Sequence, residues 1–182
     1  TMALAPQDTF AKQRGTAVAG QPVIDPANWT ASEMTATDKW CYALHDREID
    51  ELRAAAALYD NDKLNLLRLG REAFDLPHFA AVLSDIRREL LYGRGFALFR
   101  GLPVDDFGKR ATAIAFWAIG RHLGDDVLSQ NKHGHVLGHV TDIGESRSNP
   151  SQRGPYSREE IPFHVDCCDI VGLLCMEVSK NG

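Results

Sequence analysis

The sequence lacks any apolar run that approaches the roughly 20 residues a helix needs to cross a bilayer. Its N-terminus also lacks the apolar core of a secretory signal peptide, so we expect a cytoplasmic protein with no membrane partner. Basic residues are few, because 20 Lys and Arg against 25 Asp and Glu give a formal net charge of -5. Since no basic run is available to bind a phosphate backbone, we expect no nucleic-acid partner.

Cysteine is scarce and unevenly placed. Cys41, Cys167, Cys168 and Cys175 are too few for a disulfide scaffold in a chain of 182 residues, so reduced thiols are expected. Neighbours on a strand point to opposite faces, which argues against a disulfide between Cys167 and Cys168. The same alternation predicts that Cys167 and Cys175 are small buried apolar residues, and that Cys168 faces a possible metal.

The composition is that of a globular chain. Of its 182 residues 44% are hydrophobic and 25% charged, enough to bury a core in one domain. Residues 1–45 are rich in Ala, Thr, Pro and Asp and are expected to form an extended lead-in, with Trp29 and Trp40 as isolated anchors. We assign residues 46–182 to a single domain.

Apolar spacing predicts three amphipathic helices followed by strands. The helices are expected to begin near Asp46, Asp75 and Asp105. Runs rich in branched and aromatic residues predict strands at residues 96–100, 161–166 and 170–178. Because the helices come first and most strands late, the pattern favours an α+β fold with a mainly antiparallel sheet.

The strand predicted at "FHVD" carries a candidate metal site. Alternate residues of a strand share a face, so His164 and Asp166 are expected to project together. One imidazole and one carboxylate, completed by a distant histidine, form the facial triad of non-haem Fe(II) oxygenases. The alternative is a hydrogen-bonded histidine and carboxylate with a structural role alone.

A second histidine cluster offers another metal reading. "NKHGHVLGHVTD" places His133, His135 and His139 in a glycine-rich loop, and metal-binding cupins use a His-x-His pattern. No Glu follows at the cupin spacing. A cupin-like metal protein is still one alternative for this cluster. The other alternative is that these are solvated loop histidines.

Four blocks together resemble a known family. "LYGRGFALFRGLPV", "AFWAIGRHLG", "SQNKHGHVLGHVTDIG" and "PFHVDCCDIVGLLC" are similar, in order and separation, to the TauD/TfdA-like taurine catabolism dioxygenases, in particular fungal and bacterial members of broad substrate range. The resemblance covers the chain from about Trp29 onward. It implies a double-stranded β-helix, or jelly roll, that uses Fe(II), 2-oxoglutarate and O2.

The resemblance also assigns roles to residues. His164 and Asp166 match the first two iron ligands, whereas the third ligand and the arginine that binds 2-oxoglutarate have no counterpart before Gly182. We therefore expect residues 46–182 to be the N-terminal part of a jelly-roll domain in a longer enzyme, with cofactor-binding residues beyond Gly182. The family places Ser129, Gln130 and Asn131 beside the substrate pocket.

The activity implied is the oxidation of an unactivated C–H bond in a small anionic substrate, with release of succinate and CO2. An amino acid or other carboxylate is favoured over a sulfonate, because the loop at Ser129 to Asn131 does not repeat the histidine-based pattern of a strict taurine enzyme. A non-catalytic jelly-roll binding module is the alternative from another class. Formation of a homo-oligomer is left open.

Overall fold

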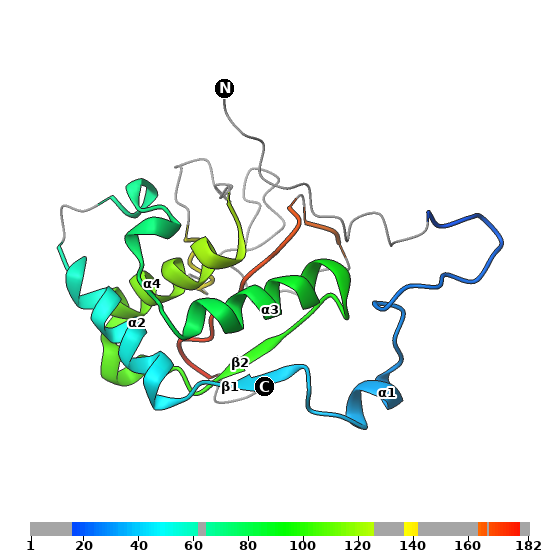
Figure 1. The fold of residues 1–182 in the computed structure, drawn as a ribbon, viewed down its shortest axis with the longest axis horizontal. Helices are drawn as coiled ribbons and strands as arrows, with labels where there is room; N and C mark the ends of the chain where they lie inside the picture. The colour runs from blue at the N-terminus through cyan, green and yellow to red at the C-terminus, as the bar shows by residue number, and fades with distance from the viewer. Residues whose placement is uncertain (1–15, 62–64, 126–136, 142–163, 167, 179–182) are drawn as a thin grey trace. The chain divides into compact units, whose positions relative to one another are not determined.

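The computed structural model describes residues 16–61, 65–125, 137–141, 164–166 and 168–178. The chain divides into two compact units, one formed by residues 1–125 and 174–182 and the other by residues 126–173. Every helix and strand of the described residues belongs to the first unit. Its elements are α1 (Ala31–Thr35), β1 (Cys41–Ala43), α2 (Asp46–Leu58), η2 (Leu66–Arg68), η3 (Arg71–Ala73), α3 (Phe79–Tyr92), β2 (Leu98–Arg100) and α4 (Val104–Leu123) (Figure 1).

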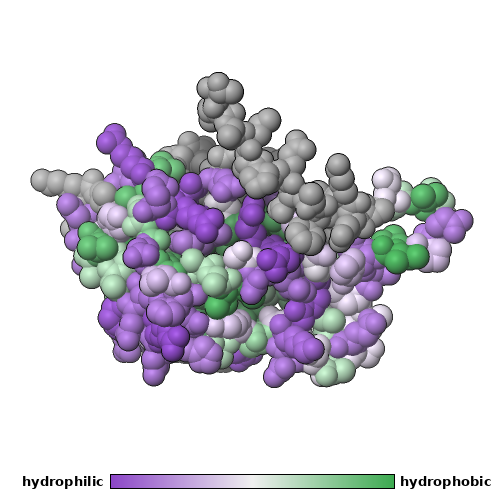
Figure 2. All heavy atoms as spheres, in the orientation of Figure 1, coloured by the Kyte–Doolittle hydropathy of each residue, from purple (hydrophilic) through white to green (hydrophobic). Residues whose placement is uncertain are grey.

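Three amphipathic helices form the core of the first unit. α4 packs against both α2 and α3. Leu52 of α2, Leu83 of α3 and Ile114 of α4 are at most 1% exposed, and each lies on the apolar stripe that the helical spacing predicted. The opposite surfaces are largely hydrophilic on the face drawn in Figure 2. Among the described residues, no helix combines the length and apolarity that crossing a membrane requires.

The strand predicted at residues 96–100 is present as β2 (Leu98–Arg100), but its pairing is parallel where a mainly antiparallel sheet was expected. β2 pairs with β1 in parallel, with Cys41 opposite Leu98 and Tyr42 opposite Phe99. The described pair is therefore not antiparallel. Its direction follows from the connection, because the chain between β1 and β2 runs through α2 and α3 and returns to the starting end of the sheet. β1 itself was not predicted, since it lies within the expected lead-in.

The two late strands are absent from the described residues. Residues 164–166 and 168–178 contain no strand, and Val165 and Leu173 are 95% and 85% exposed. A strand needs a neighbour to pair with its N–H and C=O groups, and no described segment pairs with these residues. For the same reason Cys175 is exposed and not buried as predicted. The described residues are α-rich with one two-stranded sheet, so the double-stranded β-helix is not confirmed.

The lead-in packs through its tryptophans. The Trp29 indole N–H donates a hydrogen bond to the carbonyl of Arg94 at 2.9 Å, and its ring lies 4.9 Å from that of Phe96. The Trp40 ring lies 5.9 Å from the same phenylalanine. These contacts hold the chain before β1 against the chain before β2, which matches the role of anchors expected for both tryptophans.

A buried glutamate joins β1 to α2. Glu48 is 5% exposed; its carboxylate accepts the backbone N–H of His45 at 2.8 Å and the hydroxyl of Tyr42 at 2.5 Å. Burial, together with the hydrogen bond and negative charge of Glu48, raises the pKa of Tyr42 to about 12. The helix begins at Asp46, as the sequence predicted, and the residue at its N-cap position is His45.

A carboxylate from α2 caps the N-terminus of α3. Glu51 accepts the backbone N–H groups of His78 and Phe79, each at 3.0 Å, and lies 2.5 Å from the His78 ring nitrogen Nδ1. These two N–H groups have no partner within the helix. α3 therefore begins at Phe79, and not near Asp75 as predicted, because its cap comes from another helix.

Replacing Glu51 with alanine is expected to lower the free energy of unfolding by about 1–2 kcal/mol, since it removes the cap. Burial raises the pKa of Glu51, but the N–H groups of Phe79 and His78 and the His78 ring lower it more, so the net pKa lies below 4.5. The stabilisation is then complete above pH 4.5 and is lost as the pH falls through the lowered pKa. Urea unfolding at several pH values measures this.

The matched control is Asp50→Ala, because Asp50 is an exposed carboxylate on the same helix. It is expected to change the free energy of unfolding by less than about 0.5 kcal/mol. Equal losses in the two variants would contradict the capping role of Glu51.

A glycine bends α4 close to its start. Gly108 has φ 70° and ψ 169°, a backbone conformation that side chains strongly disfavour. Gly108→Ala is expected to destabilise the protein by about 1–3 kcal/mol through backbone strain alone, because an added Cβ meets no atom within 4 Å. Gly120→Ala, in the regular part of α4 with equally open space, is expected to stabilise it by about 0.4–1 kcal/mol. Thermal unfolding of both variants tests this opposite sign.

Candidate metal centre

The predicted pair of metal ligands lies close together. His164 Nε2 is 3.9 Å from Asp166 Oδ1, and the two side chains are 56% and 45% exposed. The pair approaches as the His-x-Asp spacing predicted, although the backbone of residues 164–166 is not a strand. Both side chains are thus accessible from solvent while remaining near each other.

The two donor atoms fit a first-row metal ion. Metal bonds to imidazole nitrogen and carboxylate oxygen are about 2.0–2.2 Å long. Two such bonds together exceed the 3.9 Å between Nε2 and Oδ1, so one cation can contact both atoms. One nitrogen and one charged oxygen are the donor types of two ligands of a facial triad, which leaves other coordination positions open. Facial ligands lie at right angles, with donor atoms about 3 Å apart, so the pair would have to close by about 1 Å to take these positions.

The third ligand is not among the described residues. They contain no group of three or more His, Cys, Asp or Glu side chains placed to hold a metal. Cys168, which alternation placed on the metal face, is half-buried with a free thiol. His164 and Asp166 therefore offer two donor atoms, and the third ligand of a facial triad would have to come from outside the described residues.

The other predicted site residues are mostly beyond the described part of the chain. His139 is described and exposed. The cupin-like histidine set and the substrate contacts therefore remain predictions. Outside the described residues lie Ser129, Gln130, Asn131, His133, His135 and Cys167.

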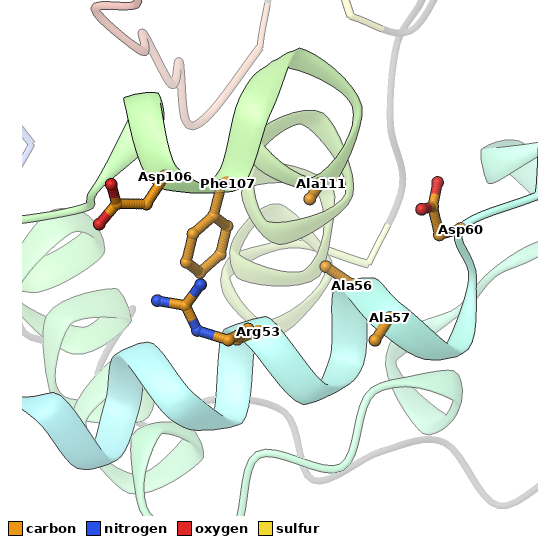
Figure 3. A pocket seen from close by; sticks show the side chains of 7 residues that line it. All are labelled: Arg53, Ala56, Ala57, Asp60, Asp106, Phe107 and Ala111. Carbon is orange, nitrogen blue, oxygen red and sulfur yellow. The ribbon is translucent and has the colours of Figure 1, made fainter.

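A separate cavity lies between α2 and α4. It has a volume of about 170 Å³, and in Figure 3 the Arg53 guanidinium lies beside the ring of Phe107, with its Cζ 4.7 Å from the ring centre. Ala56, Ala57 and Ala111 line it, and Asp60 and Asp106 lie at its sides. Asp60 already forms an ion pair with Arg110 at 2.9 Å. None of the predicted site residues lines this cavity.

The comparison with known families decides the assignment. The sequence model described as "Taurine catabolism dioxygenase TauD, TfdA family" matches residues 60–182. The chain belongs to this family. TauD/TfdA proteins are typically Fe(II)- and 2-oxoglutarate-dependent dioxygenases, and the matched range contains both His164 and Asp166. The resemblance found in the four sequence blocks is confirmed.

Two curated relatives extend the comparison. The chain is 29% identical to "FR-33289 synthase" of Streptomyces rubellomurinus over 163 residues, which cover 89% of this chain and 48% of that protein. It is 24% identical to "Taurine hydroxylase-like protein SAT17" of Stachybotrys chartarum over 164 residues, which cover 87% of this chain and 43% of that protein. The chain thus spans about half the length of the curated relatives it matches.

Sequence reasoning missed the ionisable side chains that organise the first unit. Glu48 and Glu51 lie in a charged stretch that resembles a solvated helix face, and His122 lies near the end of α4. The partners of Glu51 and His122 are backbone groups distant in sequence. Glu48 binds the nearby Tyr42 hydroxyl and His45 N–H. The capping-box pattern could have identified Glu48, because in that pattern a Glu follows three residues after the N-cap residue of a helix.

Proposed function

We propose that this protein is an Fe(II)/2-oxoglutarate-dependent dioxygenase that oxidises an unactivated C–H bond of a small anionic substrate and releases succinate and CO2. The proposal rests on one observation above all. An imidazole nitrogen and a carboxylate oxygen lie 3.9 Å apart, within the part of the chain that the TauD/TfdA family model matches.

His164 and Asp166 would hold the metal. His164 offers the Nε2 lone pair and must be neutral to do so, hence protons compete with the metal for this atom. Asp166 brings a negative charge that attracts the cation. When bound, the iron and 2-oxoglutarate supply oxygen activation, with 2-oxoglutarate as the electron donor that becomes succinate and CO2. The half-exposed position of both ligands leaves their solvent side accessible to small molecules.

The substrate class follows from sequence and family. We propose an amino acid or other small carboxylate before a sulfonate, because the loop from Ser129 to Asn131 lacks the histidine pattern expected of a strict taurine enzyme. One relative has taurine in its name, but that name describes the relative and does not identify the substrate of this chain. The three classes are compared by incubating the protein with a panel of amino acids, carboxylates and sulfonates and measuring the succinate released with each compound.

Anaerobic titration of the full-length protein with Fe(II) and 2-oxoglutarate tests the proposal. A weak visible charge-transfer band is expected when both bind at one site. Zn(II), which has no redox chemistry and a filled d shell, is the control and should give no band. An absent band, together with no succinate release in air, would favour the non-catalytic binding module.

A further inference from the structure

Two side chains of α4 hold the backbone of the loop before α3. The Trp117 indole N–H donates to the carbonyl of Leu69 at 3.1 Å, and His122 Nε2 lies 3.1 Å from the carbonyl of Phe74. Both side chains are buried, with Trp117 4% and His122 7% exposed. The segment from Leu69 to Phe74, which contains η3, is therefore fixed to α4 at both ends.

The partner of His122 determines its tautomer. A carbonyl oxygen only accepts hydrogen bonds, so Nε2 carries the proton that it donates to Phe74. The other nitrogen, Nδ1, then has an unprotonated lone pair in the neutral ring. It is buried, and no atom of the described residues is within hydrogen-bonding distance of it.

Protonation of His122 would place an N–H group at this unpartnered position. A buried donor without an acceptor destabilises the folded state, and the new positive charge would add to this. The charges nearby are mainly positive: Arg71 belongs to η3, and Arg87 of α3 donates to the carbonyl of Leu123 at 3.0 Å. The carboxylate of Asp125, which is 87% exposed, lies 3.7 Å from Arg87.

We propose that His122 is an acid-sensitive latch. Its neutral ring holds the Leu69 to Phe74 segment on α4, and protonation favours opening of the segment, because the new Nδ1–H and its charge can reach water only when the segment opens. Trp117 forms the matching hydrogen bond at the other end of the segment, but its indole does not take up a proton at any pH at which the protein is folded. Loss of the His122 bond therefore loosens one end of the segment first.

The expected pH range follows from the environment of His122. Burial lowers the pKa of His122, the Phe74 carbonyl raises it, and Arg71 lowers it, with a net value below the ordinary 6.5. The unfolded chain therefore binds the proton more readily than the folded one. The stabilisation is complete above pH 6.5 and is lost as the pH falls from there through the lowered pKa.

Hydrogen exchange measured by mass spectrometry tests the latch on the full chain. Peptides covering residues 69–76 are compared at two pH values, one well above 6.5 and one near 5, after correction for intrinsic exchange rates. We expect protection of this segment to fall several-fold at the lower pH. Peptides from the centre of α2 are expected to keep their protection.

Three variants separate titration from simple loss of a contact. His122→Gln keeps a neutral donor and should abolish the pH dependence, Trp117→Phe should lower protection equally at both pH values, and His139→Gln should behave like wild type. If His122→Gln fails to fold, an NMR titration of the His122 ring in wild type is compared with the exchange data. Unchanged protection in wild type, or a pH dependence that persists in His122→Gln, would overturn the latch.

Discussion

Asp166→Ala is expected to abolish 2-oxoglutarate-dependent turnover of the full-length protein. The substitution removes the charged member of the proposed ligand pair, and a single imidazole cannot chelate. We expect Fe(II) affinity to fall by more than about 100-fold. Losing only a residue that hydrogen-bonds to a metal ligand already lowers affinity by about 10- to 100-fold, and losing the ligand itself should cost more. Succinate release in air and the anaerobic charge-transfer band measure the two effects separately.

The neighbouring carboxylate provides the control. Asp169 is exposed and lies three residues further along, so Asp169→Ala removes the same charge from nearly the same place. It is expected to retain turnover and the charge-transfer band. His164→Ala should match Asp166→Ala, because the two residues act as one site. Full activity in Asp166→Ala, or equal loss in Asp169→Ala, would refute the assignment of the ligand pair.

The helices were predictable because their information is local. Leu52, Leu83 and Ile114 lie on stripes with a period near 3.6 residues, and each stripe is buried where the spacing placed it. The end of α3 was predictable for the same reason, since Gly93 follows the last turn and caps it. A pattern within one helix is sufficient to identify that helix.

The strands were less predictable because pairing is not local. The apolar run at residues 170–178 has the composition of a strand, yet no described segment pairs with it. β1 is only three residues long and owes its existence to β2, which lies more than fifty positions later. The start of α3 has a similar cause, since the carboxylate of Glu51 that caps it belongs to another helix.

The candidate metal site was predictable in part. His164 and Asp166 are two residues apart, so their proximity was predictable from spacing alone, even though the strand that justified the prediction is not observed. The third ligand was beyond reach, because a facial triad draws it from a distant part of the chain. Family membership, and not local pattern, is what turns a common dipeptide spacing into a candidate iron site.

Leu52→Ala is expected to lower the free energy of unfolding by about 2–5 kcal/mol, the range for removing a large aliphatic side chain from a packed core. Leu52 is fully buried in α2, whereas Leu58, one and a half turns later on the same helix, is 76% exposed. Leu58→Ala makes the same chemical change and should alter stability by less than about 0.5 kcal/mol. Because the two variants make the same Leu→Ala change, the difference between them reports mainly on burial. Chemical denaturation of the two proteins measures it, and similar losses would mean that α2 does not pack through Leu52.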